Sequence, residues 1–233
     1  MKLQTRQTLW RDALYMSGMV VLALGVTLST KTGLGVSTTT AIPYAISGPT
    51  GIPLSLLVFV IYLVMIALQF FIKGKNRQWR DLLQLPVNMG FSAVMGWFES
   101  VIRVSFSHLW QNLLLVAASV ILTGMGIVLT VNMQLVPNPP DGLAQTMSVA
   151  MKRNMGFAKN TLDFICVAIS AVIDLVTRRR LISVGLGTVL AMIFIGRAVA
   201  VFNRLWKVHL MALAGISQPA KSEKHLDAEG KAL

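Results

Sequence analysis

Long apolar runs, separated by short clusters of charged residues, make up most of this chain. Six of the runs are about 20 residues long, which is the length that a helix needs to cross the hydrocarbon core of a bilayer. They cover residues 12–30, 52–73, 81–102, 110–132, 157–177 and 181–203. The pattern therefore predicts an all-α integral membrane protein with six transmembrane helices.

Two turn-rich, semi-polar stretches interrupt the apolar pattern. Residues 32–40 (TGLGVSTTT) and 137–142 (PNPPDG) each follow a long apolar run, and they open the weakly apolar segments 36–48 and 139–151. These segments are too short for full crossings, so we expect two re-entrant half-helices that neighbouring helices bury. Paired interruptions at matching places in two halves are typical of the binding site of a repeat-built transporter.

The two halves share one order of features: a span, a break rich in Gly or Pro, a short segment and two more spans. Gly25 aligns with Gly126, and the features that follow recur at similar spacing in both halves. Apolar sequences align with one another readily, so the order of features carries more weight than residue identity. Three spans per half is an odd number, which would turn the second half upside down. We therefore expect two inverted three-helix repeats, over about 12–104 and 110–206.

Charge gives these spans an orientation. The chain is 55% hydrophobic and 13% charged, with a net charge of +12. In so apolar a chain, basic loops are expected to face the cytoplasm and anionic lipid rather than nucleic acid. Six crossings with the N-terminus inside place most Lys and Arg inside, although Arg178, Arg179 and Arg180 then lie outside. Eight crossings would put either the basic loop 73–80 or both charged termini outside, so six is preferred.

We accordingly expect a multi-pass protein of the bacterial inner membrane, with both termini cytoplasmic. Residues 1–206 would form one polytopic membrane domain. Residues 207–233 would form an interfacial segment followed by a disordered polar tail, because the last residues hold little apolar content.

Several short motifs resemble a known family. Residues 32–37 (TGLGVS), residues 139–143 (PPDGL) and the later Gly187-Thr188 with Ile195-Gly196 are similar to the YczE/YyaS/YitT group of bacterial multi-pass membrane proteins. The resemblance covers about residues 12–205. It implies a multi-pass protein of the bacterial cell membrane and suggests transport, in a family that is largely uncharacterised. Family members often carry a Pro-Trp-Asp-like stretch where this chain has residues 37–40 (STTT), so the acidic position is present only in the second half.

The two breaks supply polar groups that suit a binding site. Asn138 fits the N-cap position and Pro139 the first turn of a helix, while Asp141 would face free backbone N–H groups. A half-helix N-terminus inside the membrane concentrates unpaired donors and the positive end of the helix dipole, which suits an anionic group. Plain capping would use the same residues. We expect a substrate or ion site near the midplane formed by Ser37, Thr38, Asn138, Asp141, Gly142, Asp163 and Arg197.

Ionisable residues inside membrane spans are costly and usually functional. The four found here are Glu99, Asp163, Asp174 and Arg197. Glu99 and Asp174 lie near span ends, four residues before Arg103 and Arg178, so pairs at the membrane surface are expected. Arg197 lies deepest and is expected to face the bundle interior, with Asp163, Asp141 or Glu99 as its partner.

Signatures of enzymes are absent from the sequence. It holds no phosphate-binding glycine loop, no nucleophile elbow and no paired His and Glu, and its three histidines and one cysteine are scattered. We expect no enzymatic activity, no cofactor and no metal. The expected partners are membrane lipid and an unknown small solute, with a homo-oligomer left open and no nucleic acid. The sequence favours a small transporter or permease-like protein, and the alternative is a non-transporting membrane scaffold or regulatory protein.

Overall fold

The computed structural model describes residues 2–216, and this part of the chain is all-helical. It contains α1 (Lys2–Thr30), α2 (Thr38–Thr50), α3 (Leu54–Lys73), α4 (Gln84–Val101), α5 (Leu109–Asn132), α6 (Pro139–Ala150), α7 (Met155–Arg178) and α8 (Leu186–Leu213). Two short 3-10 helices, η1 (Gly74–Asn76) and η2 (Trp79–Leu83), link α3 to α4. The all-α prediction is therefore confirmed for these residues.

Among the described residues, five helices are long and apolar enough to cross a membrane, which makes this a membrane protein by composition and length. They cover Arg6–Thr30, Leu54–Asn76, Leu109–Asn132, Met155–Arg178 and Leu186–Leu213. The expected span 81–102 forms α4 but is not among the five, because Gln84, Asn88 and Glu99 lower its apolar character. Gln84 and Asn88 are both buried against other helices. The sixth crossing stays a prediction.

The helices α2 and α6 have the lengths expected of half-helices. They contain 13 and 12 residues, so each is about 20 Å long at about 1.5 Å per residue, against a hydrocarbon core of about 30 Å. Both follow an irregular loop, and both N-caps, Ser37 and Asn138, have the same extended backbone, with φ of −57° and −60° and ψ of 143°. Neither N-cap side chain makes the capping hydrogen bond that the sequence suggests.

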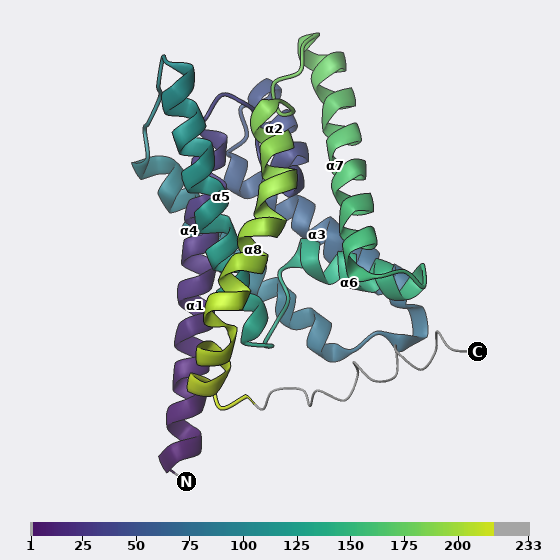
Figure 1. The fold of residues 1–233 in the computed structure, drawn as a ribbon. Coiled ribbons are helices and arrows are strands. Elements are labelled where there is room, and N and C mark those ends of the chain that lie inside the picture. The colour runs from purple at the N-terminus through teal and green to yellow at the C-terminus, as the bar shows by residue number, and fades with distance from the viewer. Residues whose placement is uncertain (1, 217–233) are drawn as a thin grey trace, which may run out of the picture.

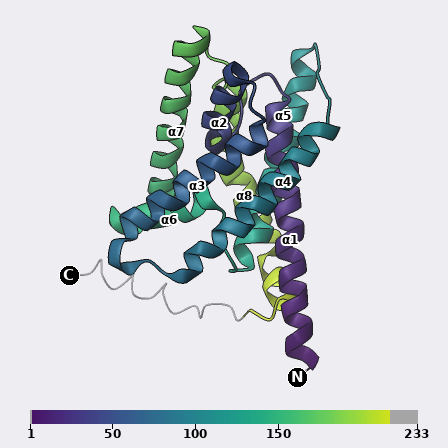
Figure 2. The ribbon, with the colours of Figure 1, turned by 180° about the vertical axis from the view of Figure 1, so that it is seen from behind.

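The helices pack as a bundle in which each half-helix lies against the other half of the chain (Figure 1). Helix α2 packs on α7, and α6 packs on α3. Helix α1 runs along α5, and α5 also packs on α8. The view from behind shows α3 and α4 covering the opposite face of the bundle (Figure 2). The main apolar core includes Leu22, Val58, Tyr62, Phe91 and Met95.

Two glycines let α1 and α5 cross closely. A Cβ on Gly25 would come within 2.6 Å of the backbone nitrogen of Thr123, and a Cβ on Gly126 within 2.6 Å of the backbone nitrogen of Leu22. The contacts are reciprocal: Gly25 faces Thr123, three positions before Gly126, and Gly126 faces Leu22, three positions before Gly25. Small residues at such crossings are what allow the backbones of membrane helices to approach.

The loops before the two half-helices are held by different kinds of contact. Before α2, Val36 N donates to Ser183 O over 3.0 Å, and Gly187 N donates to Leu34 O over 2.6 Å. Before α6, Arg11 Nε donates to Met133 O over 2.6 Å and the Tyr15 hydroxyl donates to Val136 O over 2.9 Å. Backbone N–H and C=O groups that are buried away from water need such partners.

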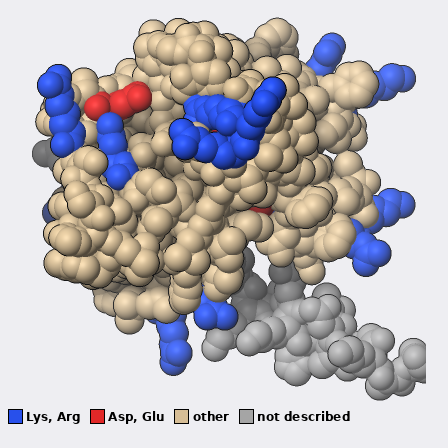
Figure 3. All heavy atoms as spheres, turned by 90° about the horizontal axis from the view of Figure 1, so that it is seen from above, with Lys and Arg blue, Asp and Glu red and all other residues tan. Residues whose placement is uncertain are grey.

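The two ends of the bundle carry basic residues. Helix α1 begins at one end, and α7 ends at Arg178 at the opposite end (Figure 1), where Arg179 and Arg180 are exposed. Seen from above, Lys and Arg side chains stand out from a largely uncharged surface (Figure 3). Residues 207–213, expected in an interfacial segment, continue α8. The expected disordered tail at 217–233 lies outside the described residues.

We expect Gly126→Ala to destabilise the fold by about 1–3 kcal/mol, because the added methyl group meets the backbone of Leu22, which cannot move aside as a side chain would. Thermal unfolding in detergent measures the effect. Gly90→Ala in α4 is the matched control, since its Cβ would meet only Met19 Cε at 3.8 Å. Equal unfolding temperatures for the two variants would contradict the close crossing.

Candidate functional site

A cavity of about 350 Å³ lies where the first turns of α2 and α6 face α7. The first break contributes Ser37, Thr38 and Thr39 to its lining, and the second break contributes Asn138, Pro140 and Asp141. Much of the remaining wall is apolar and comes from α1, α5 and α8. The two interruptions of the chain, about 100 residues apart in sequence, thus share one space.

Two charged residues of α7 connect the starts of the half-helices. Lys159 Nζ lies 2.8 Å from Asp141 Oδ1 in the first turn of α6. Asp163 Oδ1 accepts a hydrogen bond of 2.7 Å from the Thr38 hydroxyl in the first turn of α2. Lys159 and Asp163 are four residues apart, so they project from one face of α7. This face of α7 therefore holds both half-helices at the cavity.

Local sequence explains why each half-helix begins where it does. Pro139 and Pro140 occupy the first two helical positions of α6, where a missing N–H leaves no hydrogen bond unmade. At the start of α2, Thr40 N donates to Ser37 O over 3.0 Å, and its hydroxyl donates to the same oxygen over 2.9 Å. Threonine hydroxyls that bond locally favour helix starts over helix interiors.

The structure brings most of the expected site residues together. Five of them line the cavity: Ser37, Thr38, Asn138, Asp141 and Asp163. Gly142 lies on another face of the same turn of α6, where a Cβ would meet Gln69 Oε1 at 2.7 Å. Gly142 therefore lies against the amides of Gln69 and Gln84 and lines the larger cavity on that side of α6 rather than the smaller one. The role of these residues in binding stays a prediction.

The placement expected for Arg197 is wrong. Its side chain is exposed on the outer face of α8, and its guanidinium lies 5.5 Å from the centre of the Phe194 ring. No ion pair of Arg197 occurs among residues 2–216. Ile195 and Val199 of α8 line the cavity instead, and at about 100° per residue they point away from position 197. Asp141, one of its expected partners, pairs with Lys159.

Sequence reasoning assigned no role in the site to Lys159. It is the fifth residue of α7, which begins with Met155, so the sequence suggests a basic residue at a membrane surface. The available signal was its spacing of four residues from Asp163, which predicts a shared helix face. Asn160 also lines the cavity.

The other two carboxylates that the sequence places in spans bind segments near helix ends. Asp174 lies 4.0 Å from Arg178, as expected for an end pair, and its Oδ2 also accepts hydrogen bonds from Ser183 N and Ile182 N over 2.7 and 2.8 Å. Glu99 Oε2 accepts from Ser55 N over 3.3 Å at the start of α3. Arg103 lies beyond the end of α4 and is exposed. Glu99 therefore accepts a hydrogen bond at the start of α3 and does not form the expected pair with Arg103.

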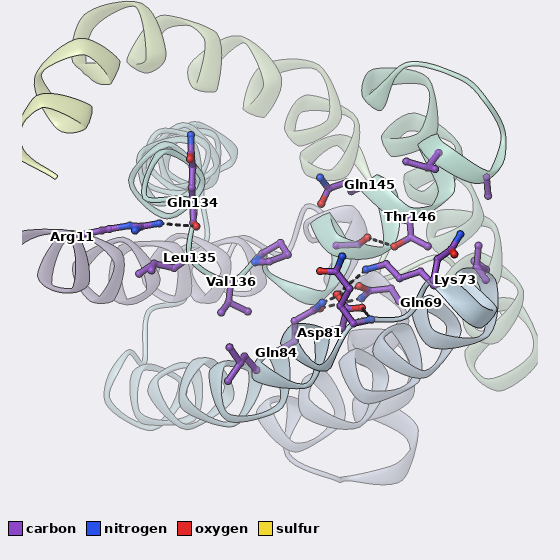
Figure 4. Close-up of a pocket in the computed structure, with 18 residues that line it drawn as sticks. Arg11, Gln69, Lys73, Asp81, Gln84, Gln134, Leu135, Val136, Gln145 and Thr146 are labelled. Atoms are coloured by element: carbon purple, nitrogen blue, oxygen red, sulfur yellow. Dashed lines mark hydrogen bonds and ion pairs between the residues drawn. The ribbon is translucent and has the colours of Figure 1, made fainter. Parts of the chain in front are cut away.

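A second and larger cavity, of about 780 Å³, lies on the side of α6 that faces α3 and η2 (Figure 4). Its wall includes a buried pair of amides: Gln69 Nε2 donates to Gln84 Oε1 over 3.1 Å, and Gln84 Nε2 donates back over 2.9 Å. Gln69 Nε2 also donates to Pro139 O over 3.1 Å. The first turn of α6 and this amide pair therefore separate the two cavities.

The lining of the larger cavity is polar and partly charged. Arg11, Lys73 and Asp81 contribute to it, and Lys73 Nζ lies 2.7 Å from Asp81 Oδ1 (Figure 4). Within the described residues, no group of three or more His, Cys, Asp or Glu is arranged to hold a metal ion. The smaller cavity offers one ammonium, two carboxylates, hydroxyls and two amides, which suit reversible binding of a small polar or charged molecule.

Comparison with known proteins identifies a family but no described relative. The chain matches the family described as "Family of unknown function (DUF6198)" over residues 9–204. The matched region contains both half-helices and every residue of the smaller cavity. No curated protein and no solved structure matches the chain significantly.

Since Arg197 has no ionic partner among the described residues, we expect Arg197→Ala to change the free energy of unfolding by no more than about 0.5 kcal/mol. Thermal unfolding in detergent measures this. Asp174→Ala is the contrasting variant and should destabilise by about 1–3 kcal/mol, because it leaves the buried N–H groups of Ile182 and Ser183 without an acceptor. A larger loss of stability for Arg197→Ala than for Asp174→Ala would contradict the exposed position of Arg197 and would support a buried ion pair.

Proposed function

Because the chain belongs to the DUF6198 family, whose function is unknown, we propose its role from its geometry: a small membrane transporter or permease-like protein. A small solute would bind between the two half-helices. The observation that carries this proposal is the cavity of about 350 Å³ lined jointly by the first turns of α2 and α6. Half-helices whose ends meet inside the bilayer are a recurring way in which membrane transporters build a solute site.

Reciprocal packing supports a further part of the proposal, that the halves are inverted repeats. Helices α2, α3 and α4 begin at residues 38, 54 and 84, and α6, α7 and α8 begin 101 or 102 positions later, at residues 139, 155 and 186. Helix α2 packs on α7 just as α6 packs on α3. The contacts of Gly25 and Gly126 at the crossing of α1 and α5 are reciprocal as well. Contacts exchanged in this way are expected of two copies related by a two-fold axis.

The same proposal includes the finer features of membrane topology. We place α4 as a sixth crossing whose polar residues face inward, where Gln84 bonds Gln69 and Asn88 donates to Phe59 O over 3.0 Å. Both termini would be cytoplasmic in a bacterial inner membrane, because most Lys and Arg then lie inside. The resemblance of short motifs to the YczE/YyaS/YitT group would imply the same placement. Membrane lipid would surround the bundle, and a second copy is not needed to complete the cavity.

Solute movement would require the barrier between the two cavities to open. The first turn of α6 and the pair of Gln69 and Gln84 form that barrier. These contacts are hydrogen bonds between neutral side chains, each worth only about 0.5–1.5 kcal/mol net. The path would lead from the smaller cavity to the larger one beside Arg11 and Lys73. We propose binding and movement of a solute, and no enzymatic step.

Accessibility of introduced cysteines tests this proposal. In a Cys166→Ala background, which removes the buried native thiol, we expect Ser37→Cys and Asn138→Cys to react with a membrane-impermeant thiol reagent from both sides of oriented vesicles. A solute site with alternating access is reached by water from each side in turn.

Control positions make the result interpretable. Ala23→Cys, fully buried in the core, should stay unreactive, and Ser105→Cys, in the exposed loop after α4, should react from one side only. Reaction of Ser37→Cys and Asn138→Cys from one side alone, or not at all, would favour the scaffold or regulatory role and overturn transport.

A further inference from the structure

The charges that line the smaller cavity do not balance. Its ionisable acidic and basic side chains are Asp141, Lys159 and Asp163, which are two carboxylates and one ammonium. A charge inside a membrane is expensive unless a partner compensates it. With both carboxylates ionised, the cavity carries one net negative charge, which a ligand with a positive charge would compensate.

The short-range contacts identify which carboxylate lacks a direct ion pair within the described part of the chain. Lys159 is engaged with Asp141 at 2.8 Å. Asp163 Oδ1 receives the neutral hydroxyl of Thr38, and its Oδ2 has no hydrogen bond or ion pair within residues 2–216. Asp163 is only 9% exposed and lines the cavity. It presents a buried carboxylate, with no cation in contact among the described residues, to the space where a ligand would lie, and a cation beside such a carboxylate interacts strongly because little water screens the pair.

The same arrangement disfavours an anion, although half-helix N-termini in a membrane would ordinarily attract one. Each N-terminus already faces a carboxylate of the protein. Asp141 is the third residue of α6, and Asp163 accepts the hydroxyl of Thr38, the first residue of α2. An anionic ligand would therefore meet two like charges before it reached either helix end.

The walls and the position of the cavity indicate that the ligand also has an apolar part. Leu22, Val26, Ile127 and Val199 line it, and Tyr62 adds an aromatic residue to the lining. Helices α7 and α8 stand apart beside it (Figure 1), and the exposed residues Met155 and Met192 line it from these two helices. A molecule dissolved in the bilayer could enter between them.

We infer that the smaller cavity binds a small organic cation with an apolar body, whose ammonium group pairs with Asp163. The apolar body would lie against α1, α5 and α8. The volume of about 350 Å³ is sufficient for one such molecule. This inference names the solute class of the proposed transporter, so it rests on the proposed function for its biological meaning, whereas binding itself can be measured without transport.

Calorimetric titration of the full chain tests the inference with three probes of similar size: benzyltrimethylammonium, the neutral benzyl alcohol and the anion benzenesulfonate. Nanodiscs of phosphatidylcholine avoid the adsorption of cations to anionic lipid. We expect saturable binding of benzyltrimethylammonium, and binding at least about tenfold weaker for the other two. Absence of binding by the cation, or equal binding of the anion, would overturn the inference.

Two substitutions locate the binding. Asp163→Asn should weaken binding of benzyltrimethylammonium by about tenfold or more, and the matched control Asp12→Asn, which removes an exposed carboxylate outside the cavity, should leave it unchanged. Equal binding of the cation by Asp163→Asn and Asp12→Asn would contradict the assignment. If Asp163→Asn does not fold, the comparison of the cation with the neutral and the anionic probe on the unchanged chain still decides the inference.

The titration tests the cation site and the cysteine experiment tests transport, so the two can fail independently. If benzyltrimethylammonium binds at Asp163 while introduced cysteines react from one side only, the cation site stands and transport fails. If the cysteines react from both sides and the cation does not bind, transport stands and the solute belongs to another class.

Discussion

The structure depends on one constraint: two helices that begin inside an apolar bundle must find partners for their starts within the protein. Helix α7 meets this need for both. Lys159 reaches the first turn of α6 through Asp141, and Asp163 reaches the first turn of α2 through Thr38. These contacts come from two positions one turn apart, so the half-helices are held at a fixed separation. The cavity between them follows from that separation.

The crossing of α1 and α5 supplies the framework for this arrangement. Gly25 and Gly126 bring the two backbones together at the centre of the bundle. The loops that lead to α2 and α6 leave the C-terminal ends of these same two helices, at Thr30 and Asn132. A close, reciprocal crossing therefore places the two breaks on opposite ends of one compact pair, and each returning half-helix then packs on a helix of the other half.

Most of this architecture could be predicted from the sequence, because Gly and Pro interrupt helices for local reasons. The clusters at 32–40 and 137–142 located both half-helices, and Asn138 and Ser37 stand at their N-cap positions. Side-chain direction was harder to predict. Arg197 lies deep in a span, yet depth along a helix does not decide which face a residue occupies, and its neighbours Ile195 and Val199 take the inner face. Lys159 was missed because a lysine near a span end resembles a surface anchor.

The two ends of the site differ in how firmly they are closed. At the loop before α2, backbone bonds join Val36 to Ser183 and Leu34 to Gly187, and a Cβ on Gly35 would meet Gly185 N at 2.5 Å, so no side-chain rotation can separate these segments. At the loop before α6, the ties are the side chains of Arg11 and Tyr15. A hydrogen bond from a side chain can be broken by a change of rotamer, whereas packed backbones move only as collective units. The side of the cavity beside α6, where the larger polar cavity also lies, is therefore the side that the fold leaves easier to open.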